Sequence, residues 1–472
     1  MGFLDKFDIK ESTFVPYLNT GTMLDIANGK YVPGADGCTI LNGGVPQTMG
    51  LAGRQQRFKS TEILSFVMNV LGRYEHAEAV VYDTESSLQK DRILSMGDMP
   101  VENGNNRLKL ISHTEYQTED FVEFIKKVAE DKRKNAKEYT VQTPILDPVT
   151  QEPVSMMIPT LVVIDSWSEM RSKAVTDAMD KVNSSDAGTN MVYMTEGNIK
   201  TKVMSQLPRI ASRAGIYFFF TVHIGEKYSL DPYAPKNKDL PHMKSSDKLK
   251  NAGSDFSFLV STLLEARDAK VLQSDKKECF YPDVFTNPTE YSRIGNVVCR
   301  CKNNGSGTQF SHVVSQSTGI DTNLTNYDYL RTNKFYGLPG NHITHTTTLT
   351  PQTSISRTNI SKKVREDRRL ARALEILSQL CQVQQSWSLK DMPVPLDMTP
   401  ETLAEKLTAM SNYHIDDILE SRGYWSYSKN ETRPYLSLFD ILAIVDNKYK
   451  PKLHKANPDG KAGETSKKQK AT

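Results

Sequence analysis

From about residue 46 onward, the chain alternates between compact apolar segments and longer segments in which apolar residues recur every three or four positions. Each compact segment is bounded by polar or turn-forming residues, a pattern typical of strands buried on both faces of a sheet. We expect such strands at 48–53, 78–85, 107–113, 160–166 and 216–224. The periodic segments predict helices at 59–74, 118–135 and about 195–214. Alternating strands and helices favour an α/β fold with a mostly parallel central sheet covered on both faces.

The pattern changes after residue 256. Three further apolar segments are separated by turns, at 256–266, 295–304 and 308–316. This arrangement predicts antiparallel strands that extend the sheet. Earlier in the chain, residues 137–158 contain the turn sequence DPVTQEP and predict an inserted hairpin.

The length of 472 residues suggests two or three domains, at roughly 150 residues each. An N-terminal segment, 1–45, precedes the main domain, which we place at 46–335. Residues 336–360 are rich in Thr and Ser and low in apolar residues, so we expect a linker there. Residues 361–450 begin with a basic helix at 361–380 and predict a small, mainly helical C-terminal domain. The remaining residues, 451–472, predict a disordered basic tail.

Composition narrows the class of protein only slightly. The net charge is +3, from 59 basic and 56 acidic residues, which neither requires nor excludes a nucleic-acid partner. The five cysteines are odd in number and form no paired framework, which favours a reducing compartment. Cys299 and Cys301 lie in VVCRCK without a second Cys or His cluster, so we interpret them as strand residues. The chain contains no apolar run of about 18 residues and no apolar signal core at its start, which predicts a soluble, cytoplasmic protein.

The segment LAGRQQRFKST between the first strand and the first helix resembles a phosphate-binding loop. The general pattern is G-x-x-x-x-G-K-[ST], and Phe58 here stands in place of the second glycine. In this reading, backbone N–H groups and the helix N-terminus face phosphate, Lys59 reaches the β- and γ-phosphates and Ser60 holds Mg²⁺. We expect Phe58 to pack where a glycine would otherwise let the backbone turn. The nucleotide-binding candidates are Gly53, Arg54, Gln55, Gln56, Arg57, Phe58, Lys59, Ser60 and Thr61, called the 53–61 loop below. The alternative is a helix N-terminus with a surface lysine.

Polar residues at the ends of three other strands add to this candidate site. Asp165 ends the strand TLVVIDS, where a carboxylate could hold Mg²⁺ through water, or could be an ordinary strand-ending residue. Glu85 follows AVVYD and could polarise an attacking water, with Asp83 as the competing candidate. His223 ends FFFTVHI and could sense the γ-phosphate or have a structural role.

These four elements, in this order, resemble the RecA-type ATPase core, and are most similar to the bacteriophage strand-exchange recombinases of the UvsX type. The resemblance covers roughly residues 20–335 and depends on the F-K-S end of the loop, on YDTE followed by SMG at 95–97, and on a histidine at the position of His223. It implies ATP and Mg²⁺ as cofactors and a homo-oligomeric filament with ATP between protomers, with residues 1–45 a candidate for the contact between protomers. It also implies that Arg300 and Lys302 act in trans as catalytic cations, with two solvent-facing strand cations as the alternative. Relatives stack an aromatic residue on adenine seven positions after the glutamate, and Arg92 occupies that position here.

The resemblance further implies two DNA-binding loops, at about 167–195 and 225–255. The second carries lysines for phosphates and tyrosines for stacking on bases, although its acidic residues leave a solvated loop as the alternative. The DNA-binding candidates are Lys227, Tyr228, Lys236, Lys238, Lys244, Lys248 and Lys250, with Tyr233 as a further stacking residue.

We therefore expect a DNA-dependent ATPase that forms filaments on single-stranded DNA and promotes pairing with homologous duplex DNA and strand exchange. Expected partners include single-strand-binding and loading proteins, in the host cytoplasm if a phage encodes the chain. One alternative is a RecA-fold hexameric DNA helicase. Another is a non-enzymatic protein that keeps the fold for assembly.

Overall fold

The structure is a computed structural model of the whole chain. It describes residues 14–97, 99–112, 117–179, 188–211, 213–227, 238, 240–253, 255–282, 287–303, 305–385, 397–428 and 431–451. Nearly all of the expected basic tail and the first 13 residues therefore lie outside the described residues.

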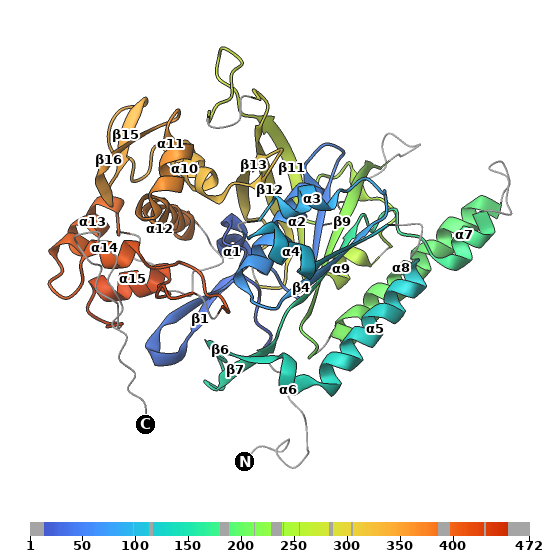
Figure 1. The fold of residues 1–472 in the computed structure, drawn as a ribbon. Helices are drawn as coiled ribbons and strands as arrows, with labels where there is room; N and C mark the ends of the chain where they lie inside the picture. The colour runs from blue at the N-terminus through green and yellow to red at the C-terminus, as the bar shows by residue number, and fades with distance from the viewer. Residues whose placement is uncertain are drawn as a thin grey trace.

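A large mixed sheet forms the centre of the molecule (Figure 1). Within the described ranges it has ten strands, nine of them in the order β14-β13-β12-β11-β3-β9-β8-β4-β5, with β10 paired to β9. The parallel part consists of β11 (Thr262–Val271), β3 (Thr48–Gly53), β9 (Ile216–Glu226), β8 (Thr160–Asp165), β4 (Glu78–Asp83) and β5 (Leu108–Ser112). The antiparallel strands are β12 (Tyr291–Cys301), β13 (Gln309–Ser315), β14 (Gly319–Ile320) and β10 (Asp247–Leu249). The predicted α/β class, with a mostly parallel sheet extended by antiparallel strands, is confirmed.

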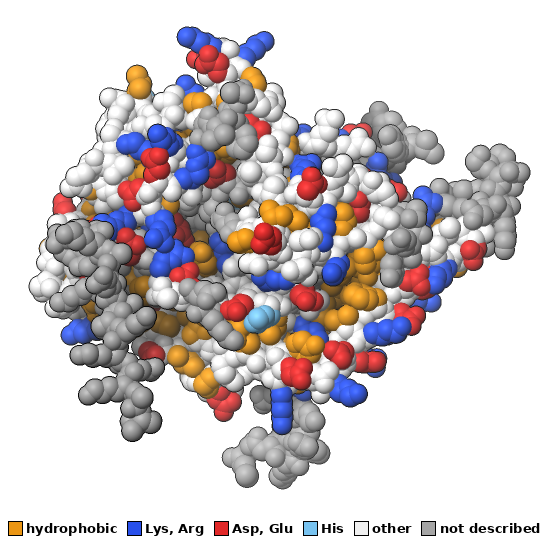
Figure 2. All heavy atoms as spheres, in the orientation of Figure 1, with side chains coloured by type: hydrophobic (Ala, Val, Ile, Leu, Met, Phe, Trp, Pro, Cys, Tyr) orange, Lys and Arg blue, Asp and Glu red, His pale blue; other side chains and the backbone are white. Residues whose placement is uncertain are grey.

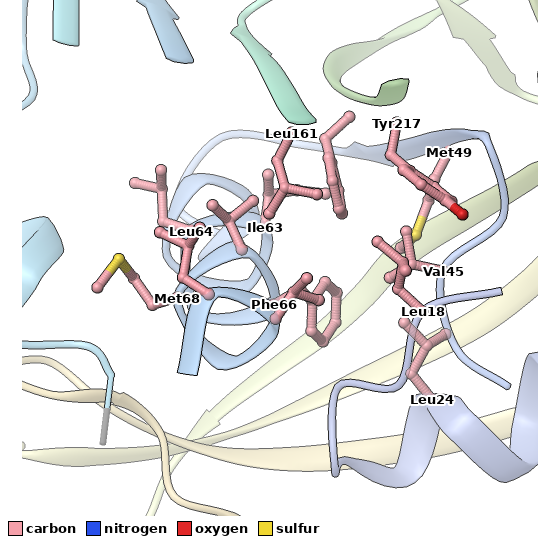
Figure 3. Packing of buried hydrophobic residues seen from close by; sticks show 14 of the residues in the cluster. Leu18, Leu24, Val45, Met49, Ile63, Leu64, Phe66, Met68, Leu161 and Tyr217 are labelled. Carbon is pink, nitrogen blue, oxygen red and sulfur yellow. The ribbon is translucent and has the colours of Figure 1, made fainter. Parts of the chain in front are cut away.

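Helices cover both faces of the parallel strands because successive residues of each strand point to opposite sides. On β4, Val81 joins the cluster around helix α2 (Lys59–Arg73), whereas Val80 joins the cluster around α5 (Thr118–Lys134) and α8 (Gly188–Ala211). Figure 1 shows α5 and α8 side by side, projecting beyond the sheet. Figure 3 shows Ile63, Leu64 and Phe66 of α2 among Met49, Leu161 and Tyr217, which come from three neighbouring strands. This packing holds α2 against one face of the parallel strands.

Shorter elements surround this core. The shorter helices of the N-terminal and sheet regions are α1 (Met23–Asn28), α3 (Lys90–Leu94), α4 (Val101–Arg107), α6 (Ala136–Tyr139), α7 (Lys173–Met179), α9 (Phe256–Leu259) and α10 (Thr322–Thr332). One 3₁₀ turn, η2 (Ala35–Gly37), lies in the N-terminal region. Two hairpins lie apart from the main sheet, β1 (Lys30–Pro33) with β2 (Thr39–Asn42), and β6 (Thr140–Leu146) with β7 (Pro153–Met157). The second is the hairpin predicted at 137–158.

The segment 336–360, expected as a linker, instead contains a packed hairpin. Strands β15 (Thr344–Thr347) and β16 (Thr350–Ser356) pair antiparallel. Ile355 is fully buried, and the ring of His345 stacks on Tyr327 of α10 with centroids 5.5 Å apart. Threonine is β-branched and favours strands, so a Thr-rich segment with few apolar residues can still form a hairpin once a neighbouring surface buries it.

The C-terminal part is mainly helical, with α11 (Ile360–Glu366), α12 (Arg368–Gln385), α13 (Pro400–Ala409), α14 (Ile415–Leu419) and α15 (Leu438–Val445), and it forms the left side of Figure 1. The single helix expected at 361–380 is broken at Asp367, whose carboxylate accepts hydrogen bonds from the N–H groups of Arg369 and Leu370. The buried apolar residues of these five helices share one cluster with Tyr31, Tyr281 and Leu324 of the N-terminal and sheet regions. The C-terminal helices are therefore packed onto the rest of the chain through a common core.

One predicted strand is partly wrong. Residues 256–259 form helix α9, and only the residues from Thr262 onward enter the sheet as β11. A short apolar run can form a strand or a buried helical turn, and periodicity alone does not distinguish the two. Phe256 on this turn is fully buried.

The surface carries both signs of charge. On the face shown in Figure 2, basic and acidic side chains are interspersed, in keeping with the small net charge. Among the helices that the structure describes, none has the length and apolar character needed to cross a bilayer. The five cysteines, all within the described residues, form no disulfide, and Cys299 and Cys301 lie on β12 as predicted.

Candidate functional site

A cavity of about 990 Å³ opens where β3, β4, β8 and β9 end, at the start of α2. β8 and β9 lie between β3 and β4, so strands that follow one another in sequence are separated in the sheet, and such a crossing point is where open α/β sheets bind ligands. The cavity is lined by Gln55, Gln56, Arg57, Phe58, Lys59, Ser60, Thr61, Thr84, Glu85, Asp165, Glu169, Arg171, His223, Ile224 and Lys250. The structure thus brings the loop residues from Gln55 to Thr61 together with the predicted Glu85, Asp165 and His223.

The 53–61 loop turns through two residues with left-handed backbones, Gln56 at φ 56° and Phe58 at φ 55°. Phe58 therefore adopts the conformation usually given to glycine, and its half-buried ring packs against the cluster around α2. Gly53 does not line the cavity, but a Cβ added to it would lie 3.1 Å from Cδ of Lys59. A small residue at Gly53 thus lets the lysine stem pass close to β3.

Lys59 is a buried cation with little compensation. Lys59 is only 8% exposed, and its Nζ donates a hydrogen bond to the Arg54 carbonyl oxygen at 3.0 Å. Burial lowers the pKa of Lys59, and the charges of Asp165 and Glu85 oppose that shift. No carboxylate of the described residues lies within salt-bridge distance of Nζ. A buried ammonium that faces a cavity in this way is suited to an anionic ligand.

Asp165, at the end of β8, lies deep in the same cavity. Its carboxylate accepts a hydrogen bond from the Thr221 hydroxyl, and the Ser60 hydroxyl is close enough to interact with it. Burial raises the pKa of Asp165, the two hydroxyls oppose the shift, and the nearby Glu85 and Asp83 raise it further. Ser60 and Asp165 are therefore the residues that could hold a divalent cation.

No cluster of three His, Cys, Asp or Glu side chains suited to a metal ion occurs among the described residues. Mg²⁺ commonly takes only one or two protein ligands and completes its shell with phosphate oxygens and waters. The Ser60 and Asp165 pair fits that ion, and does not fit a metal that needs a full protein cage.

The side chains of Glu85 and His223, which both line the cavity, contact each other. Nε2 of His223 lies 3.1 Å from Oε1 of Glu85, which also accepts from the Ser166 hydroxyl at 3.4 Å. Asp83, the competing candidate, is buried, and its carboxylate accepts the N–H groups of Glu85 at 3.2 Å and Leu88 at 2.6 Å. Asp83 therefore shapes the turn that presents Glu85, and Glu85 is the carboxylate exposed to the cavity.

Four polar lining residues were missed as members of this site: Thr84, Glu169, Arg171 and Lys250. Thr84 joins two strand ends, because its hydroxyl accepts the Ser166 N–H at 2.7 Å. Glu169 and Arg171 belong to the segment predicted as the first DNA loop, and Lys250 to the second. Closeness in sequence could have indicated Thr84, which adjoins Glu85, and Glu169 and Arg171, which follow Asp165, but Lys250 lies far along the chain from His223 and carried no such signal.

Two predicted nucleotide-binding arginines lie outside the cavity. Arg54 forms ion pairs with Glu226 at 2.9 Å and with Asp247 at 3.0 Å, so it joins the loop to β9 and to β10. Arg92 is exposed and donates to the Thr61 hydroxyl at 3.4 Å and to the Gln316 carbonyl at 3.3 Å. It thus lies beside the outer end of the loop, away from the buried part of the cavity.

Arg300 and Lys302 lie at the opposite edge of the sheet from the cavity. Lys302 N–H donates to the Ser261 carbonyl, and Ser261 pairs with Thr48 at the beginning of β3, whereas the 53–61 loop follows the end of that strand. The Arg300 guanidinium lies over the ring of Phe258, 5.2 Å from its centroid. Neither cation can reach the cavity of its own chain, which leaves action in trans as a prediction.

The candidate DNA-binding residues are distributed around the second loop. Tyr228, Tyr233 and Lys236 lie outside the described residues. Part of the loop returns to the sheet as β10, which carries the exposed Lys248 and places Lys250 directly after it. Lys244 lines a smaller groove with Arg54 and Arg57, and the Lys238 ammonium donates to the Pro241 carbonyl at 3.2 Å.

The chain was compared with models of known protein families and with curated proteins, and neither comparison found a match.

Proposed function

We propose that the chain is an ATP-dependent recombinase with a RecA-like core, which forms filaments on single-stranded DNA and promotes homologous pairing and strand exchange. The observation that carries the proposal is the meeting of four separate sequence motifs in one cavity: the 53–61 loop, Glu85, Asp165 and His223. Their order in the sequence is the one on which the resemblance to phage recombinases rests, and their meeting at strand ends supplies the groups that nucleotide hydrolysis uses.

In this proposal, Lys59 and the N–H groups at the start of α2 bind the phosphates of ATP. The Ser60 hydroxyl and Asp165 hold Mg²⁺, which neutralises phosphate charge when it is bound. Glu85 Oε1 accepts a proton from the attacking water, and the contact of His223 with that same atom passes the state of the site to the loop after β9. Arg300 and Lys302 serve the site of an adjacent protomer.

The test is the rate of ATP hydrolysis by purified full-length protein, with and without single-stranded DNA. We expect stimulation by DNA, loss of activity in Lys59→Ala, and a fall of about 100-fold or more in Glu85→Gln with nucleotide binding retained. Lys109→Ala is the matched control, because Lys109 is an exposed lysine on β5 and lies outside the cavity.

Electron microscopy with a non-hydrolysable ATP analogue and single-stranded DNA tests the assembly. Helical filaments support the recombinase, and closed rings would instead support the hexameric helicase. If the wild-type protein hydrolyses no ATP, or if Lys59→Ala keeps full activity, the proposed function is wrong.

A further inference from the structure

Lys250 has an unusually well-defined place for a residue at the end of a long polar loop. Its N–H donates to the His223 carbonyl at 2.8 Å, and its carbonyl accepts from the Ser168 hydroxyl at 2.8 Å. The same Ser168 hydroxyl accepts the N–H of His223 at 3.0 Å. The backbone of Lys250 is therefore fixed directly beside His223, on the side of the cavity that holds Glu85.

The Lys250 side chain crosses a bare stretch of backbone on its way to the cavity. A Cβ added to Gly225 would lie 2.4 Å from Cε of Lys250 and 2.9 Å from Cγ, so the aliphatic stem lies directly on this glycine. Among the described residues, no carboxylate pairs with the Lys250 ammonium within salt-bridge distance. Its charge thus remains available to a ligand in the cavity that it lines.

The charges that line the cavity give this ammonium a role. Four cations (Arg57, Lys59, Arg171 and Lys250) face three carboxylates (Glu85, Asp165 and Glu169). Without Lys250 the two signs would be equal in number, and the wall beside His223 would have no lysine to face the phosphate loop. Lys248 and Lys250 are both exposed, but Lys248, on β10, is not part of the cavity lining.

We propose that Lys250 binds the phosphates of the nucleotide held by its own chain, as a second lysine facing Lys59, and is not a DNA contact. The inference rests on the proposed nucleotide site and deepens it. Two residues after Lys250, the Ala252 carbonyl accepts a hydrogen bond from the indole N–H of Trp167, so a nucleotide charge bound by Lys250 orders the end of the second loop. The site then distinguishes triphosphate from diphosphate partly through a residue of the loop itself.

The experiment measures dissociation constants of a fluorescent, non-hydrolysable ATP analogue and of ADP for the full chain, without DNA. We expect Lys250→Ala to weaken binding of the triphosphate by about 10- to 100-fold and that of ADP less, as loss of one charge-assisted contact predicts. Lys248→Ala should leave both constants unchanged, and Lys250→Arg should recover most of the affinity. Gly225→Ala, which displaces the stem but keeps the ammonium, should reproduce part of the Lys250→Ala defect.

A second arm measures single-stranded DNA binding without nucleotide, where Lys250→Ala should equal the wild type. The inference is overturned if Lys250→Ala leaves nucleotide affinity unchanged while Lys59→Ala abolishes it, a result that leaves the proposed function standing. It is also overturned if Lys250→Ala weakens nucleotide-free DNA binding as much as Lys248→Ala does. If the wild type binds no nucleotide, the proposed function fails together with the inference.

Discussion

Replacing Phe58 with glycine and with alanine separates the backbone cost of the 53–61 loop from the packing of its aromatic ring. Phe58 has φ 55° and ψ 23°, a left-handed conformation that costs an ordinary residue about 1–2 kcal/mol relative to glycine. Its ring is half-buried against the cluster around α2. Alanine removes the ring and keeps the backbone cost, whereas glycine removes both.

The expected magnitudes follow from these two terms. Full burial of a phenylalanine side chain contributes about 1.5–3 kcal/mol, so a half-buried ring contributes about 1 kcal/mol, and Phe58→Ala should destabilise the protein by that amount. Phe58→Gly loses the same packing and about 0.5–1 kcal/mol through the greater freedom of glycine in the unfolded chain, but regains about 1–2 kcal/mol from the backbone. Glycine should therefore be as stable as alanine at this position or more stable, by up to about 1.5 kcal/mol.

Gly72, in the last turns of the same helix, provides the control. An added Cβ there meets no atom within 4 Å and the backbone is helical, so Gly72→Ala should stabilise the protein by about 0.5–1 kcal/mol. The assay is urea-induced unfolding followed by circular dichroism, with midpoints compared at equal slopes. If Phe58→Ala is more stable than Phe58→Gly by the same margin that alanine gains at Gly72, the left-handed assignment at Phe58 is wrong.

Three further predictions concern the stability of the fold, measured in the same way. Phe219→Ala should cost about 3–5 kcal/mol, because this fully buried ring lies in the centre of the sheet; a cost below about 1 kcal/mol would contradict that placement. Asp328→Ala should cost about 3–5 kcal/mol, because it leaves Arg293 without its two hydrogen bonds of 2.6 and 2.7 Å, and Arg293→Ala/Asp328→Ala should cost less than the sum of the single changes. Burial lowers the pKa of Lys200 from 10.5 to about 8. Between these values the unfolded chain binds a proton that the folded protein has released, so the free energy of unfolding rises with pH. Lys200→Met should reduce that rise by about 3 kcal/mol, and an unchanged pH dependence would refute the assignment.

Local patterns in the sequence were sufficient for the main elements of the sheet region. The strand at 48–53 and the helix that begins at Lys59 were predicted nearly to the residue, because compact apolar runs and 3.6-residue periodicity are properties of adjacent residues. The same is true of the candidate site. Carboxyl ends of parallel strands meet at one edge, so Glu85, Asp165 and His223 could be expected to converge before their order in the sheet was known.

Contacts between distant residues decided the rest. The hairpin at 344–356 carries no strong apolar signal, and Tyr327 and the C-terminal helices supply the surface that buries it. Lys250 looked like one lysine among several in a polar loop, and only the pairing of β10 with β9 beside His223 turns it toward the cavity. For Phe58, the sequence and the tertiary structure each decided a part. The sequence alone marked it as the residue in place of a glycine, whereas its positive φ and its ring packed on the core depend on how α2 lies against the sheet.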